Sequence, residues 1–317
     1  MGLGEEAIMD SLSRPIPLKW WTWEGVKDTL ASPLDSIKHN LTTLQGAVVA
    51  IDPKTGGVLT WVGGNDAQEF NIDYVLTERH PGSAFKPFVY ATAIDQGMDP
   101  CTYYANRRIA YPEFDGWSPG NADGQYEGIY SLNGALAKSI NTIAVQVILD
   151  AGIDNVIQKA RRMGMKGEIK PIPSVALGTA EVTLLELVSA YNTFLNKGAH
   201  RPYFVITRIE DQDGNVLEEF KPEPTTGVFA PETCGIINQM LANVVDRGTA
   251  SVIRYPEFDI RGAMAGKTGT SQFHSDGLFV GYNPKFLAGA WVGCFDRRVS
   301  FISLRDGMGS KTALPIW

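Results

Sequence analysis

The stretch Pro81-Gly82-Ser83-Ala84-Phe85-Lys86-Pro87 opens an apolar, helix-like run that continues to Ile94. Residues three apart lie on one face at the start of a helix, so the Ser83 hydroxyl and the Lys86 amine can meet. A desolvated lysine can take the proton of a serine hydroxyl and so make the oxygen a nucleophile. Pro87 has no N–H to donate, and we therefore expect an irregular first turn. Taken alone, the pattern favours a capping serine beside a solvated lysine, and only two further motifs reverse that preference.

A second motif, Lys267-Thr268-Gly269-Thr270, precedes two strand-like runs, 277–282 and 286–293, with a turn at Asn283-Pro284-Lys285 between them. Glycine on such a strand lets a substrate backbone come close. The lysine supplies a fixed positive charge, and the threonines supply hydroxyl donors. The alternative interpretation is an ordinary strand with a small-residue bulge.

The third motif is Ser139-Ile140-Asn141, at the head of a predicted helix over 141–149. A hydroxyl and a carboxamide two residues apart can share a proton network and orient a peptide. The common alternative for such a serine is a helix N-cap.

Two strings in the same chain repeat parts of these motifs without their context. Lys54-Thr55-Gly56 lies between the apolar runs 46–51 and 58–62 and is typical of a hairpin turn. Ser131-Leu132-Asn133 is typical of the cap of a helix over 132–138. Order along the chain separates the three motifs from these copies: the serine-lysine helix comes first, then the serine-asparagine pair, then the lysine strand.

This ordered triple resembles the penicillin-binding and serine β-lactamase superfamily, whose serine-x-x-lysine and lysine-threonine-glycine signatures it contains. Further segments resemble the transpeptidase domain of class A (bifunctional) penicillin-binding proteins, and together they extend from about Leu44 to Trp317. These segments are Ala47–Gly56, Trp61–Gly64, Arg79–Phe88, Ala176–Thr183, Ala190–Phe194, Arg247–Thr249 and Ala313–Trp317.

The resemblance implies a role for each motif residue. Ser83 is the nucleophile, Lys86 its general base, and Ser139 a proton relay that Lys267 steadies. Asn141 holds the substrate backbone or the Lys86 amine, and Thr268, Gly269 and Thr270 form the strand that binds the substrate. The N–H groups of Ser83 and Thr270 make the oxyanion hole.

The implied reaction is peptidoglycan D,D-transpeptidation through a Ser83 ester, with stem peptides as donor and amine acceptor and with β-lactam antibiotics as acylating inhibitors. The alternatives are a D,D-carboxypeptidase or a β-lactamase on the same scaffold, a non-catalytic β-lactam sensor, and a catalytically inactive homologue. The chain lacks the Glu-x-x-Leu-Asn string of class A β-lactamases and the Tyr-Gly-Asn string of class D enzymes. These absences favour slow hydrolysis of the ester.

Composition limits the other function classes. The net charge of −7 argues against nucleic acid as a partner. The three cysteines and four histidines show no metal-ligand spacing, so we expect no metal and no cofactor. No stretch is long and apolar enough to span a membrane. The resemblance implies a membrane-anchored parent protein with a glycosyltransferase domain that this chain lacks, and an extracytoplasmic location at the periplasmic face of the inner membrane.

The pattern of runs predicts an α+β fold, in which an antiparallel sheet flanked by helices adjoins an all-helical second lobe. We expect residues 1–43, with clustered tryptophans, to be the remnant of a linker and 44–317 to be the transpeptidase domain. Its sheet lobe is predicted over about 44–75 and 241–317, and its helical lobe over about 76–240. That the three motifs meet between the lobes is an implication of the resemblance.

Overall fold

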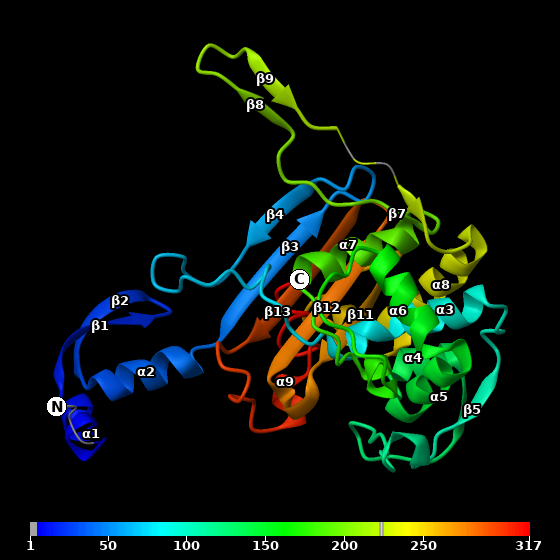
Figure 1. The fold of residues 1–317 in the computed structure, drawn as a ribbon, viewed down its shortest axis with the longest axis horizontal. Coiled ribbons are helices and arrows are strands. Elements are labelled where there is room, and N and C mark those ends of the chain that lie inside the picture. The colour runs from blue at the N-terminus through cyan, green and yellow to red at the C-terminus, as the bar shows by residue number, and fades with distance from the viewer. Residues whose placement is uncertain (1–4, 222, 224) are drawn as a thin grey trace.

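The structure is a computed structural model that describes residues 5–221, 223 and 225–317. A five-stranded antiparallel sheet runs through its centre in the order β11-β12-β13-β3-β4 (Figure 1). The bounds are β3 Gln45–Ile51, β4 Val58–Val62, β11 Ala265–Thr270, β12 Asp276–Asn283 and β13 Phe286–Gly293. The chain leaves the sheet after β4 and returns at β11, which is an edge strand. The predicted α+β fold with an interrupted sheet is therefore confirmed.

Local turn chemistry explains the hairpins of this sheet. Between β3 and β4, the Asp52 carboxylate accepts the Lys54 N–H at 2.8 Å, and Gly56 adopts a φ of 84° that glycine allows without strain. The Lys54-Thr55-Gly56 string is a turn, as its context predicts. The β12–β13 turn follows the same rule, since Asn283 Oδ1 accepts the Lys285 N–H at 2.9 Å.

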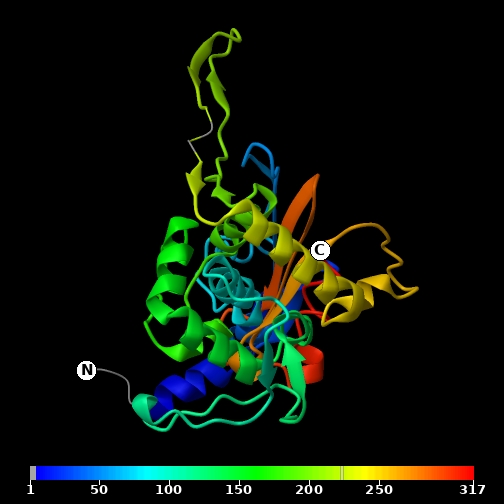
Figure 2. The same ribbon diagram turned by 90° about the vertical axis from the view of Figure 1, so that its right-hand side faces the viewer.

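Helices of the second lobe fill the long excursion between β4 and β11 and pack beside the sheet (Figure 2). They are α3 Lys86–Asp95, α4 Leu132–Lys138, α5 Asn141–Ala151, α6 Ile153–Arg162, α7 Leu184–Leu195 and α8 Pro231–Arg247, with the 3-10 turns η1 Gly82–Phe85, η2 Pro112–Phe114 and η3 Pro173–Leu177. A capping box between Thr183 and Glu186 starts α7, which lies against β13 and β3. One hydrophobic core runs through both lobes.

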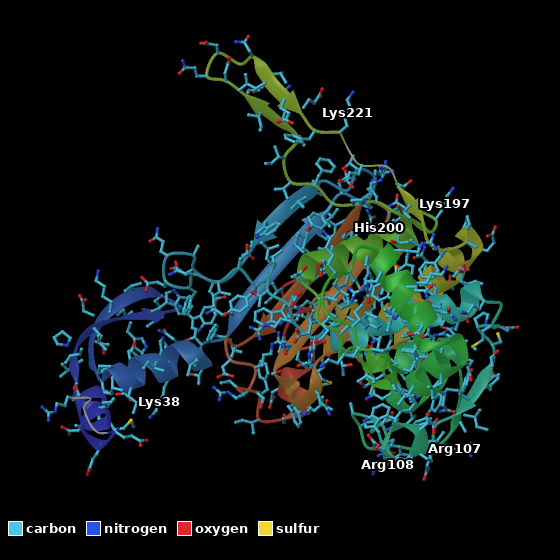
Figure 3. All side chains as sticks on the ribbon, in the orientation of Figure 1. Lys38, Arg107, Arg108, Lys197, His200 and Lys221 are labelled. Carbon is cyan, nitrogen blue, oxygen red and sulfur yellow. The ribbon has the colours of Figure 1, made fainter. Side chains whose placement is uncertain are left out.

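The helical lobe also contains short strands that the sequence pattern does not predict. They are β5 Tyr103–Ala105 with β6 Ile129–Ser131, and β7 Ala199–His200 with β10 Thr226–Gly227. A hairpin around Asp211 is formed by β8 Arg208–Glu210 and β9 Val216–Glu219, and both views show it standing away from the body (Figures 1 and 2). Arg107 and Arg108 are exposed at the opposite end of the molecule from Lys221 (Figure 3).

Ahead of the sheet lie α1 Glu5–Ser13, the hairpin of β1 Ile16–Thr22 with β2 Gly25–Ala31, and α2 Pro33–Thr42. Trp21 packs edge-on against Trp23 and against Phe70, with ring centroids 4.9 and 5.3 Å apart. The tryptophan cluster thus touches the main domain, as packing aromatics do. That this segment is a linker remnant, and that a domain begins at residue 44, stay predictions.

After the helices, η4 Ser251–Arg254 leads to β11, η5 Gln272–His274 joins β11 to β12, and α9 Leu304–Gly307 follows the sheet. Among the described residues, no helix combines the length and the apolar character that a membrane span needs.

Candidate active site

Ser83 lies in η1, one turn ahead of the helix that Lys86 begins. The Lys86 N–H donates to the Ser83 carbonyl, an i to i+3 bond that makes this turn a 3-10 helix. Pro87 follows at once and has no N–H with which to extend the α-helical pattern backwards. The irregular first turn is therefore as predicted. The Ser83 hydroxyl makes no hydrogen bond with the described residues, and its side chain is only half-buried.

The Lys86 side chain is completely buried, and its amine has three oxygen partners. It donates to the Ser139 carbonyl at 2.5 Å and to Asn141 Oδ1 at 2.7 Å, and it shares a third hydrogen bond with Ser139 Oγ at 3.2 Å, in which a neutral amine is the acceptor. Asn141 is held in turn, because its Nδ2 donates to the Gly120 carbonyl at 2.8 Å. A lysine fixed in this way cannot be the solvated lysine of the alternative interpretation.

Ser139 is not the N-cap of the helix that follows it. It occupies the turn between α4 and α5 with a left-handed φ of 59°, and Ile140 holds the cap position of α5 without a side-chain bond. Left-handed backbone is uncommon for residues other than glycine and costs free energy. This turn directs the Ser139 hydroxyl at both buried lysines, since Lys267 donates to the same Oγ at 2.9 Å. Ser131, by contrast, caps α4 as predicted, with the Gly134 N–H at 3.2 Å.

Both amines are completely buried, and this alters their proton affinities. Burial, together with the positive charge of Lys267, lowers the pKa of Lys86 well below that of an ordinary lysine. Burial also lowers the pKa of Lys267, to about 7. When charged, the Lys267 ammonium donates to two acceptors, Ser139 Oγ and the Thr268 carbonyl, the latter at 3.1 Å.

Backbone contacts press η1 against the edge strand β11. A Cβ added to Gly82 would lie 2.3 Å from the Thr270 carbonyl oxygen, and one added to Gly269 would lie 2.4 Å from the Pro81 oxygen. The Ser271 N–H donates to the Asp276 carbonyl on β12, so by alternation the Thr270 N–H points to the free edge of the sheet, where η1 lies. The Ser83 turn and the Thr270 amide thus share one edge of the sheet.

Comparison with known proteins agrees with this geometry. Residues 46–292 match the penicillin-binding protein transpeptidase domain, and residues 1–44 match the penicillin-binding protein middle domain. The chain belongs to the penicillin-binding protein transpeptidase family. It is 35% identical to penicillin-binding protein 1A of Neisseria lactamica and 40% identical to that of Aquifex aeolicus, each over 86% of this chain. The chain spans about a third of the length of these relatives, 35% and 37% respectively.

Solved structures show the same penicillin-binding transpeptidase fold. Penicillin-binding protein 1A of Haemophilus influenzae superposes with a TM-score of 0.81 at 24% identity, over 95% of this chain and 49% of that one. PonA1 of Mycobacterium tuberculosis superposes with a TM-score of 0.73 at 22% identity, over 86% of this chain and 75% of that one. The resemblance to class A penicillin-binding proteins is confirmed, and the chain is a transpeptidase domain and so an acyltransferase.

Two residues that position the motifs of this transpeptidase domain were not predicted from the sequence. Asn121 Oδ1 accepts the N–H groups of Asn141 and Thr142 at 2.9 and 3.1 Å, and so does the work of a missing cap for α5. The Tyr191 hydroxyl donates to the Ala84 carbonyl beside the nucleophile at 2.6 Å. Both act across long sequence separations from segments without a chemical motif, so no local pattern could have found them.

Both hydroxyls of the substrate strand β11 already have partners in the structure. Thr268 Oγ1 lies 2.6 Å from Thr249 Oγ1, and Thr270 Oγ1 accepts the Gly309 N–H at 3.2 Å. No cluster of three or more histidine, cysteine, aspartate or glutamate side chains suited to a metal ion occurs within the described residues.

Proposed function

We propose that this domain is a serine-type peptidoglycan D,D-transpeptidase that acts through a Ser83 acyl-enzyme. The observation that carries the proposal is the Ser139 hydroxyl, which is hydrogen-bonded at once to two fully buried lysine amines from different lobes. Ion-pair networks of ordinary structural use join opposite charges, whereas this cluster joins two bases to a hydroxyl and a carboxamide. Perturbed amines gathered in this manner mark sites of proton transfer.

In the first half-reaction, Ser83 Oγ attacks the carbonyl carbon of the penultimate D-alanine of a stem peptide. Lys86, neutral before the attack, accepts the Ser83 proton. The oxyanion that forms is held by the N–H groups of Ser83 and Thr270, and one such donor is typically worth ~3 kcal/mol. The negative oxygen develops where η1 and β11 meet.

Collapse of this intermediate breaks the C–N bond to the terminal D-alanine. The leaving nitrogen takes a proton from Ser139 Oγ, which regains one from Lys86 across the 3.2 Å contact. Lys267, in its charged form, steadies the hydroxyl during the relay. An amine of a second stem peptide then attacks the ester carbonyl and gives one proton to Lys86. The C–O bond to Ser83 breaks, Ser83 Oγ takes that proton back from Lys86, and a new peptide bond and the free enzyme result.

Substrate binding follows from the remaining residues. Asn141 orients the substrate backbone or the Lys86 amine, Gly269 allows the peptide to lie close to β11, and the hydroxyls of Thr268 and Thr270 face the terminal carboxylate. We place the domain outside the cytoplasm, at the periplasmic face of the membrane. Its parent protein is then membrane-anchored and carries a glycosyltransferase domain.

The test is acylation by a fluorescent penicillin, followed by intact mass. We expect one adduct on the wild-type chain, none on Ser83→Ala, and labelling at least ~100-fold slower for Ser139→Ala, because the proton relay is lost. Ser131→Ala is the matched control, since it removes the serine of the other serine-x-asparagine string, Ser131-Leu132-Asn133. It loses a cap worth ~1 kcal/mol but should label normally.

The lifetime of the adduct separates the related activities. We expect it to persist in water and to shorten when a D-amino acid amine is supplied. Rapid hydrolysis without an amine would instead assign a β-lactamase or a carboxypeptidase, and an adduct indifferent to amines would assign a sensor. Labelling of Ser83→Ala at the wild-type rate would refute the nucleophile.

A further inference from the structure

The segment Arg247-Gly248-Thr249, at the C-terminal end of α8, lies where the two lobes meet at the site. A Cβ on Gly248 would be 2.4 Å from the Ala137 carbonyl oxygen, so only glycine lets this segment come so close to α4. The Thr249 N–H donates to the same carbonyl at 3.1 Å. Ala137 is two residues ahead of Ser139, and the Thr249 backbone is therefore fixed to the segment that carries the relay serine.

The Thr249 side chain, by contrast, reaches the edge strand β11 of the sheet. Its Oγ1 lies 2.6 Å from Oγ1 of Thr268, the residue after Lys267 on β11. A threonine hydroxyl has one hydrogen to donate and two lone pairs. If Thr268 donates its hydrogen to Thr249, only lone pairs of Thr268 remain for a ligand, and these repel a carboxylate. If Thr249 donates, the Thr268 hydrogen is free to point at the ligand.

Thr270 shows the second of these arrangements. The backbone N–H of Gly309 can only donate, and it donates to Thr270 Oγ1 at 3.2 Å. The hydrogen of the Thr270 hydroxyl is thus left for another acceptor. Thr268 has no backbone amide in this role among the described residues, and the Thr249 hydroxyl occupies the corresponding position.

We propose that Thr249 is a further substrate-positioning residue, which donates to Thr268 and so orients the Thr268 hydroxyl towards the carboxylate of the acyl donor. The inference rests on the proposed function and deepens it. It predicts that Thr249 matters for ligands with a free carboxylate and not for ligands without one. A charged acceptor gains more from an oriented donor than a neutral one does.

The experiment compares the second-order acylation rates of benzylpenicillin and of its methyl ester, which lacks the carboxylate. Thr249→Val keeps the shape and removes the hydroxyl. We expect it to acylate about tenfold more slowly with the acid and within about twofold of wild type with the ester, the fold-change of one lost bond to a charged group. Thr249→Ser should restore the rate with the acid.

Two further variants make the result decisive. Thr268→Val should show the same selective loss, and the Thr249→Val/Thr268→Val double variant should lose no more than either single one, because the two hydroxyls act as one unit. Thr92→Val, which removes a buried hydroxyl bonded to the Phe88 carbonyl in α3, is the control for general loss of packing.

An equal loss with acid and ester would mean that Thr249 only holds the lobes together, and it would overturn the inference, as would an unchanged rate with the acid. If Thr249→Val does not fold, Thr249→Ala and Thr268→Val carry the same comparison. A wild-type chain that neither compound acylates would refute the proposed function instead, so the two failures are distinguishable.

Discussion

At the scale of single residues, the two buried lysines give acylation a defined dependence on pH. The mechanism needs Lys267 charged and Lys86 neutral, and burial lowers the pKa of Lys267 to about 7. The charged form of Lys267 is lost as the pH rises through that value, so the acylation rate should fall above about pH 7. Below it, the rate falls only where Lys86 gains its proton, and the pKa of Lys86 is itself well below the ordinary lysine value.

Lys267→Arg tests this assignment, because a guanidinium keeps its charge across the accessible pH range. We expect the variant to acylate about tenfold more slowly at pH 7, since the planar guanidinium does not fit the single hydrogen bond that the Lys267 amine makes to Ser139 Oγ. Its rate should nevertheless stay level between pH 7 and 9. The measurement is the benzylpenicillin acylation rate from pH 5 to 9. If the acylation rate of Lys267→Arg still falls above pH 7 with the same midpoint as wild type, the group that titrates is not Lys267.

The residue scale also shows what the sequence could and could not predict. Proline chemistry anticipated the irregular turn at Ser83, which the structure contains. That the Ser83 hydroxyl meets the Lys86 amine stays a prediction, because the partners of the amine in the structure are Ser139 and Asn141. The position of Ser139 could not be anticipated in this way, because a serine ahead of a helix is ordinarily a cap. Its left-handed backbone is imposed by the junction of two helices and by a partner, Lys267, that lies far away in sequence.

At the scale of elements, the site depends on how closely η1 approaches β11. Gly178 packs against the Gly82 backbone of η1 and so fixes its position. Its φ is 77°, and a Cβ there would lie 2.0 Å from the Gly82 carbonyl oxygen. We expect Gly178→Ala to displace η1 and slow acylation at least ~10-fold, since small misplacements of a nucleophile are costly. Gly124→Ala is the matched control: its φ is 68°, and nothing lies within 4 Å of the added Cβ. It should cost ~1 kcal/mol of stability and leave the rate unchanged.

Acylation rates and melting curves of the two alanine variants decide the matter. Equal rates in both would show that η1 tolerates movement away from β11.

Elements with local sequence signals were the predictable ones: α4 begins at the Ser131 cap and α7 at its capping box. The strands β5 and β6 have three residues each, too few for a pattern to register, and their pairing joins segments far apart in sequence.

At the scale of the whole molecule, a buried charge network links the two stretches that frame the oxyanion edge. Arg79, four residues ahead of Ser83, lies 3.6 Å from the Asp276 carboxylate and over the ring of Trp291. The Ser271 hydroxyl, next to Thr270, donates to the same carboxylate at 2.9 Å. The lobes thus share a core and a polar network. Such connections form only once the whole chain is folded, and the spacing of residues along the sequence does not reveal them. For this reason, family resemblance and not spacing was the basis for predicting that the three motifs meet.

The β8–β9 hairpin stands outside this arrangement, and its removal is the last prediction. Within the part of the chain that the structure describes, its strands pair only with each other, and the residues of both are exposed. The Phe220 N–H donates to the Thr207 carbonyl at 2.9 Å, so residues 207 and 220 are neighbours that an Asn-Gly turn can join. We expect the variant without residues 208–219 to acylate within about twofold of wild type and to melt within a few degrees of it, because little apolar surface leaves the core. Ser83→Ala in the same assay defines zero labelling. Slower acylation at an unchanged melting temperature would mean that the hairpin reaches the substrate, and the site would then extend beyond the two lobes.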